Sequence, residues 1–148
     1  AWLVARGVAE PAAALALASG APLAAAGDDA AGAGDPAILY RCLEAGPALT
    51  AAQVVAAIGR DVTLPPSVRL MQCWAFDLLS CRTLRPVRYH PSRSARLARL
   101  AEAASVEQLW KWIDALRSAA ATREHPLNAR LVIESLLLSY AQIFDGHR

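Results

Sequence analysis

The stretch from His125 to Phe144, His-Pro-Leu-Asn-Ala-Arg-Leu-Val-Ile-Glu-Ser-Leu-Leu-Leu-Ser-Tyr-Ala-Gln-Ile-Phe, decides the fold of this 148-residue chain. Pro126 and Asn128 mark the start of a helix, because proline cannot continue a preceding helix and asparagine accepts a bond from an unpaired first-turn N–H group. We expect the helix to run to Phe144 or Asp145, with the following glycine as its stop.

Two apolar stripes run along this expected helix. The wide stripe must be buried, and it consists of Val132, Ile133, Leu136, Leu137, Tyr140, Ile143 and Phe144. The narrow stripe lies on the far side and consists of Leu127, Leu131 and Leu138. The narrow stripe fits two interpretations, a helix enclosed within its own domain or a contact with another subunit, and periodicity alone does not separate them.

Upstream of this stretch the pattern is helical from residue 35 onward. Proline pairs, glycines and capping residues place helices at about 36–45, 51–58, 65–84, 93–104 and 106–123. In the last of these, Trp110 shares the apolar face and Trp112 points elsewhere. No segment alternates with period two over the length of a strand, so the sequence predicts an all-α fold, a helical bundle.

A change in composition divides the chain. Residues 24–34 contain few large side chains, and their pattern fits both an alanine-rich helix and a flexible linker. We therefore expect a short N-terminal unit over 1–34 and a helical domain over 35–148. Because the chain starts at Ala1, in what reads as the middle of a helix, we expect it to be a piece of a longer protein.

Composition and charge exclude several classes of protein. A net charge of +2 argues against a dedicated polyanion binder. Cys42, Cys73 and Cys81 lack the paired spacing of a disulfide framework or metal site, which indicates a reducing, cytoplasmic setting. No apolar run is long enough to span a bilayer, so we expect a soluble protein without membrane contact.

The sequence offers no motif for chemistry. His90 and His125 have no cysteine or carboxylate at metal-ligand spacing, and no phosphate-binding glycine loop is present. Asp77 and Asp114 lie on expected helices, where solvated or ion-paired carboxylates are the ordinary interpretation. We therefore expect no catalytic, cofactor or metal site in this chain.

Arginines form the strongest charge feature, a run without any acidic residue from Arg82 to Arg99. Arg93, Arg96 and Arg99 fall near one helix face and are the candidates for contact with phosphates. A solvated or ion-paired face, a protein contact and direct nucleic-acid contact all remain open for this run. Trp112 is a candidate rim residue or partner anchor, because exposed tryptophans are frequent interface hot spots.

Segments at both ends of the chain resemble the bacterial DNA polymerase III delta-prime family. The last long helix of that family has the pattern Leu-Asn-x-x-Leu-x-x-Glu/Asp-x-Leu-Leu-Leu, matched here by Leu127, Asn128, Leu131, Glu134, Leu136, Leu137 and Leu138. The preceding stretch from Leu97 to Leu109 is similar to the same region. Residues 2–8 and 18–24 look like the end of the family's small helical lid domain.

The resemblance implies a subunit of the clamp loader, a ring that places the beta sliding clamp on primed DNA. Residues 1–34 would then be a remnant of the AAA+ lid domain and linker, and 35–148 the collar domain that assembles with delta and gamma/tau subunits. The beta clamp and primed DNA would be reached only through the complex. Leu23 stands near the place of a sensor arginine, which agrees with a subunit that does not hydrolyse ATP.

A collar role implies no catalysis by this piece of the DNA polymerase III holoenzyme, and no cofactor. The surface for partner subunits would come from Leu127, Leu131, Leu138 and Trp112. Two rival interpretations are an unrelated helical adaptor domain for protein–protein contacts and a small enzyme with a dispersed site.

Overall fold

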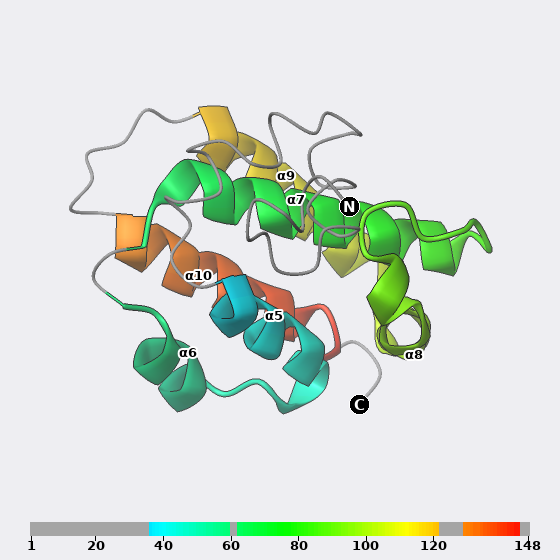
Figure 1. Cartoon of the computed structure of the whole chain (residues 1–148), viewed down its shortest axis with the longest axis horizontal. Helices are drawn as coiled ribbons and strands as arrows, with labels where there is room; N and C mark the ends of the chain where they lie inside the picture. The colour runs from blue at the N-terminus through cyan, green and yellow to red at the C-terminus, as the bar shows by residue number, and fades with distance from the viewer. Residues whose placement is uncertain (1–35, 60–61, 122–128, 146–148) are drawn as a thin grey trace, which may run out of the picture.

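The computed structural model describes residues 36–59, 62–121 and 129–145, and within them the chain is helical without strands. This confirms the predicted all-α bundle. The N-terminal unit, the expected helix start at Pro126 and Asn128, and the side chain of Leu127 lie outside the described residues. The elements, shown in Figure 1, are α5 (Pro36–Ala45), η1 (Gly46–Ala48), α6 (Ala51–Ala57), α7 (Leu64–Arg82), η2 (Pro91–Arg93), α8 (Ser94–Ala103), α9 (Val106–Ala121) and α10 (Ala129–Gln142).

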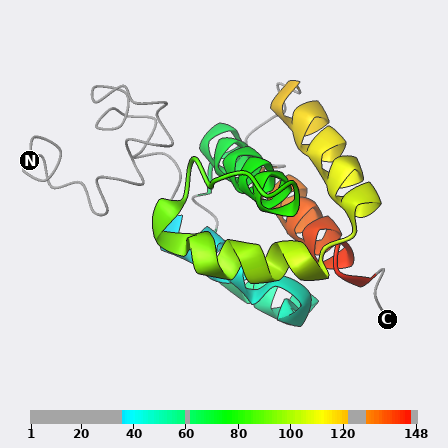
Figure 2. The same cartoon turned by 90° about the vertical axis from the view of Figure 1, so that its right-hand side faces the viewer.

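Helix α7 is the centre of the bundle. It packs against α8, α9 and α10, and Figure 2 shows α7 and α10 between α9 on one side and α5 with α8 on the other. A helix with neighbours on several sides must be apolar over most of its circumference. Accordingly, the fully or nearly fully buried residues of α7 include Val68, Leu70, Met71, Trp74, Ala75 and Leu78.

The wide stripe of α10 is the other half of the core, as predicted. Ile133, Leu137 and Tyr140 are completely buried. The Tyr140 hydroxyl donates to the Leu43 carbonyl at 2.6 Å and accepts from the indole N–H of Trp74 at 3.2 Å. These bonds satisfy both aromatic polar groups, so α5, α7 and α10 are joined inside the core without an unpaired donor.

The prediction that Trp112 points away from the core is wrong. Trp112 is 2% exposed, and its indole N–H donates to the Leu136 carbonyl of α10 at 2.9 Å. Helix α9 contacts both α7 and α10, so its buried stripe follows Leu109, Trp112 and Leu116. Trp110, which was placed on the core face, is instead 47% exposed. The fold therefore leaves Trp112 no surface to offer a partner.

Local signals account for the helix ends that the sequence marked. Thr50 and Gln53 form a capping box, in which each side chain accepts a bond from the other's backbone N–H group. Gly46 follows α5 with φ of +56°, a conformation that glycine adopts without steric cost. These local features fix where α5 ends and where α6 begins.

Candidate functional site

The narrow stripe of α10 lies on the molecular surface. Leu131 is 64% exposed and Leu138 is 37% exposed, on the side of α10 opposite the core. Ser135, between them on the helix, is exposed as well, as is Gln142 one turn further on. We call Leu131, Ser135, Leu138 and Gln142 the outer stripe. Among the described residues, no helix encloses these leucines.

One side of the outer stripe is bordered by an ion pair within α10. Arg130 pairs with Glu134 one turn along the same helix, with Nε to Oε1 at 2.7 Å. The Arg130 guanidinium also donates to the backbone carbonyl of Val55 at 3.3 Å, which ties α10 to α6. Val55 itself is 51% exposed. The outer stripe therefore presents two exposed leucines beside a polar, ordered margin.

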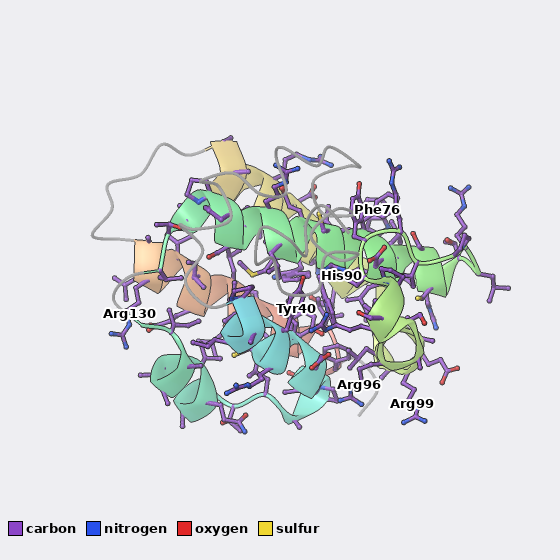
Figure 3. All side chains as sticks on the ribbon, viewed as in Figure 1. Tyr40, Phe76, His90, Arg96, Arg99 and Arg130 are labelled. Carbon is purple, nitrogen blue, oxygen red and sulfur yellow. The ribbon has the colours of Figure 1, made fainter. Side chains whose placement is uncertain are left out.

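The structure does not assemble Arg93, Arg96 and Arg99 as a phosphate site. Arg93 pairs with Glu44 at 2.9 Å, and its guanidinium carbon lies 4.0 Å from the centre of the Tyr40 ring. Arg96 Nε donates to the backbone carbonyl of Glu44 at 2.9 Å. Both cations thus stabilise the C-terminal end of α5, where unpaired carbonyls favour positive charge. Arg99 extends from α8 into solvent (Figure 3).

A buried polar network that sequence reasoning missed joins Asp77, His90 and Tyr40. His90 Nδ1 lies 2.8 Å from Asp77 Oδ2, and His90 Nε2 lies 3.1 Å from the Tyr40 hydroxyl. Because a carboxylate only accepts, Nδ1 carries a proton towards Asp77, and in the neutral ring Nε2 accepts from Tyr40. The Tyr40 and His90 rings meet edge-to-face with centres 5.3 Å apart, and Figure 3 labels them next to each other.

Of the two states expected for Asp77, solvated or ion-paired, the structure excludes the first and places the carboxylate beside His90. Asp77 and His90 are both 0% exposed. The carboxylate also accepts the backbone N–H groups of Arg88, Tyr89 and His90, at 2.9, 3.1 and 2.8 Å. A carboxylate that accepts this many hydrogen bonds can be buried, and here these bonds hold the loop after α7 against that helix. A carboxylate within the apolar arc of α7 was the available signal in the sequence.

The network is arranged for structure and not for chemistry on a bound molecule. No substrate atom can reach a His90 ring that has no exposed surface. Burial raises the pKa of the Cys73 thiol to about 11, with a smaller lowering from Arg69 and a smaller raising from Asp77. Burial raises the pKa of Cys42 and Cys81 too. These thiols are therefore protonated at neutral pH and are poor nucleophiles.

A small hollow is a further feature of the described residues. A hollow of about 110 Å³ between α7 and α9 is lined by Leu64, Pro65, Val68, Arg69, Gln72, Ala119 and Ala120. Pockets for ordinary small ligands are larger, at roughly 300–1,000 Å³. Within the described ranges no group of three or more metal-ligating side chains occurs. None of the described helices has the length and apolarity needed to cross a membrane.

Comparison of the chain with protein-family models, with curated proteins and with solved structures finds no match. The outer stripe is thus the candidate functional surface on the strength of its own residues.

Proposed function

We propose that this chain is a non-catalytic assembly domain, the helical collar domain of a clamp-loader subunit of the delta-prime type. The observation that carries the proposal is the outer stripe, because its leucines are exposed on a helix whose other side is the core. Apolar strips bordered by polar residues are typical of protein–protein interfaces. The resemblance of Leu131, Glu134 and Leu138 to the delta-prime pattern supplies the choice of complex.

The energetics suit an interface built from several contacts. Covering the exposed parts of Leu131 and Leu138 contributes roughly 1–3 kcal/mol, at about 25 cal/mol per Å² of apolar surface. This changes a dissociation constant by about 5- to 150-fold and does not by itself hold a complex. The proposal therefore makes the outer stripe one part of a ring contact with delta and gamma/tau, in the cytoplasm, with the beta clamp and primed DNA reached through the ring.

Rigidity supports the same role. The residues on the inner side of α10, Ile133 and Leu137, are completely buried, and Arg130 holds the helix to α6. The stripe is consequently presented in one orientation, which lowers the entropy lost on association. A domain that joins two neighbours in a ring needs such a pre-ordered face.

Light scattering after size-exclusion chromatography tests the proposal, with the chain alone and mixed with delta and gamma/tau subunits of the same organism. We expect one copy of the chain in the mixed complex. The variant Leu131→Glu/Leu138→Glu should lose association while keeping its thermal midpoint. The control Ala95→Glu/Ala98→Glu adds the same charges at exposed positions of α8 and should assemble normally.

Two results would contradict the proposal. If the double glutamate variant of α10 unfolds, the outer stripe belongs to the core of the domain. If that variant assembles as well as the control, the leucines are not part of the ring contact.

A further inference from the structure

A second exposed surface lies at the C-terminal end of α7, where the chain projects from the bundle as a loop (Figure 1). We call it the arginine tip, and it consists of Phe76, Arg82, Leu84, Arg85, Arg88 and Tyr89. Arg82, Arg85 and Arg88 belong to the same acid-free run as Arg93 and Arg96. Arg93 and Arg96 are bound to Glu44 of α5, whereas Arg82, Arg85 and Arg88 are not bound to α5.

The arginine tip is held in place by its backbone. The N–H groups of Thr83 and Arg85 donate to the carbonyls of Leu79 and Ser80, at 3.0 and 2.7 Å, so the end of α7 is capped without help from the arginine side chains. Further along, Asp77 binds the N–H groups of the last three loop residues. The arginine tip is therefore a pre-ordered loop.

No carboxylate among the described residues neutralises the charge of the arginine tip. Among the described residues, Arg82, Arg85 and Arg88 form no ion pair. The nearest carboxylate along the helix, Asp77, is fully buried and is engaged by backbone N–H groups and His90. Three guanidinium groups thus face solvent within seven residues, a density that attracts a polyanion.

Apolar surface is exposed among these charges. Phe76 is 46% exposed and packs edge-to-face on Tyr89, with ring centres 5.4 Å apart. The Arg88 guanidinium carbon lies 5.5 Å from the centre of the Tyr89 ring. Leu84 is 95% exposed and has φ of +58°, a left-handed conformation that costs free energy for a leucine. The arginine tip therefore carries two aromatic rings and an exposed leucine side chain among its guanidinium groups.

We propose that the arginine tip binds single-stranded nucleic acid. Arg82, Arg85 and Arg88 contact successive phosphates, while the exposed Phe76 ring stacks on a base and Leu84 packs against another. An unpaired strand fits better than a duplex, because only unpaired bases present their faces to a ring. This inference is independent of the proposed assembly role of α10.

An acidic peptide is the other polyanion that carries apolar groups, and the shape of the surface disfavours it. Peptides are bound along a strand edge, in a groove between helices or, for acidic motifs, by a cluster of arginines. The described chain has no strand, the hollow on α7 lies at the other end of that helix, and the arginine tip protrudes. A protruding loop can insert among splayed bases, as apolar wedges do in other nucleic-acid complexes.

Fluorescence anisotropy with a fluorescein-labelled 20-nucleotide oligo(dT) tests the proposal on the 148-residue chain. We expect a dissociation constant of roughly 10–100 µM at 50 mM NaCl, and a slope of about −2 for the logarithm of affinity against the logarithm of salt, from three phosphate contacts. The variant Arg82→Gln/Arg85→Gln/Arg88→Gln should bind at least about tenfold more weakly. A control, Arg41→Gln/Arg99→Gln/Arg117→Gln, removes the same charge from exposed positions elsewhere and should stay within about twofold.

Phe76→Leu separates stacking from charge. Leucine keeps apolar volume at this position but has no flat ring, so affinity for oligo(dT) should fall about three- to tenfold with an unchanged salt slope. A blunt DNA duplex of the same length should bind more weakly than oligo(dT) and should not respond to Phe76→Leu. Circular dichroism of every variant checks that the fold is retained.

Three outcomes overturn the proposal. The first is no binding of oligo(dT) by the unmodified chain up to about 0.5 mM at 50 mM NaCl, where even non-specific phosphate contacts are detected. The second is an equal loss of affinity in the two triple variants, which would make binding a matter of net charge. The third is tighter binding of a labelled 20-residue peptide of alternating Glu and Leu than of oligo(dT), lost in the variant of the arginine tip, which would assign the surface to an acidic protein partner.

Discussion

Replacing Asp77 with asparagine removes the charge on which the loop after α7 depends. In the unmodified chain this carboxylate accepts three backbone N–H groups and the Nδ1–H group of His90. Asparagine has nearly the same shape but keeps only one acceptor oxygen, and its NH₂ group would face N–H donors. The substitution therefore tests the hydrogen bonds and the charge with little change in packing.

The expected loss of stability follows from burial. A hydrogen bond to a charged group contributes about 1.5–3 kcal/mol, and a buried donor left without its partner costs about 1–3 kcal/mol. Since one oxygen of asparagine can still accept, we expect Asp77→Asn to lower the free energy of unfolding by about 3–4 kcal/mol. A loss of this size raises the unfolded fraction several hundredfold. It is also a large part of the total free energy of unfolding, which is only about 5–15 kcal/mol for most domains.

Urea unfolding followed by tryptophan fluorescence measures this loss, because the Trp74 ring lies 5.2 Å from the His90 ring. With a slope of about 1.5 kcal/mol per M, the midpoint should fall by about 2 M. Asp114→Asn is the matched control, since Asp114 is 71% exposed and only 3.6 Å from Arg117, and it should change stability by less than about 0.5 kcal/mol. A loss below about 1 kcal/mol for Asp77→Asn would refute the structural role assigned to the carboxylate.

Three further outcomes are expected. Leu84→Gly should raise the free energy of unfolding by about 0.5–1 kcal/mol, because glycine adopts the left-handed conformation without steric cost; a lower thermal midpoint would contradict this. Gly46→Ala should lower the free energy of unfolding, measured in urea, by at least about 2 kcal/mol. A Cβ atom at this position would collide with the buried Leu100 side chain, and the φ of Gly46 is +56°. Burial raises the pKa of the Cys73 thiol to about 11, so only about one molecule in a thousand is ionised at pH 8. DTNB should therefore modify Cys73, which is buried, more slowly than the partly exposed Cys81 until the chain unfolds. Equal rates in the folded state would show that Cys73 is accessible.

Much of the fold was predictable from local pattern. The buried stripe of α10, the apolar arc of α7 and the start of α6 after Thr50 all depend on residues within a few positions of one another. Such signals survive in a sequence because helix periodicity and capping act within one or two turns. The exposed position of Leu131 and Leu138 was one of two interpretations that this periodicity left open.

The error at Trp112 has a physical cause. A helix that contacts one neighbour buries a single stripe, but α9 contacts α7 and α10, and the direction of its buried arc depends on where those helices lie. Periodicity places Trp110 and Trp112 on different faces and does not say which face is covered. The hydrogen bond from Trp112 to the Leu136 carbonyl joins residues on two helices, and the sequence pattern around either residue does not predict it.

By itself, therefore, the sequence determined that this chain is a set of amphipathic helices and that its last helix has apolar residues on two sides. Only the tertiary structure decided which arginines serve α5 and which remain in solvent, and that Asp77 lies beside His90 and Tyr40. The reason is the range of the interactions. Helix propensity and amphipathicity act over a few residues, whereas these bonds join residues up to 52 positions apart and exist only once the bundle has packed.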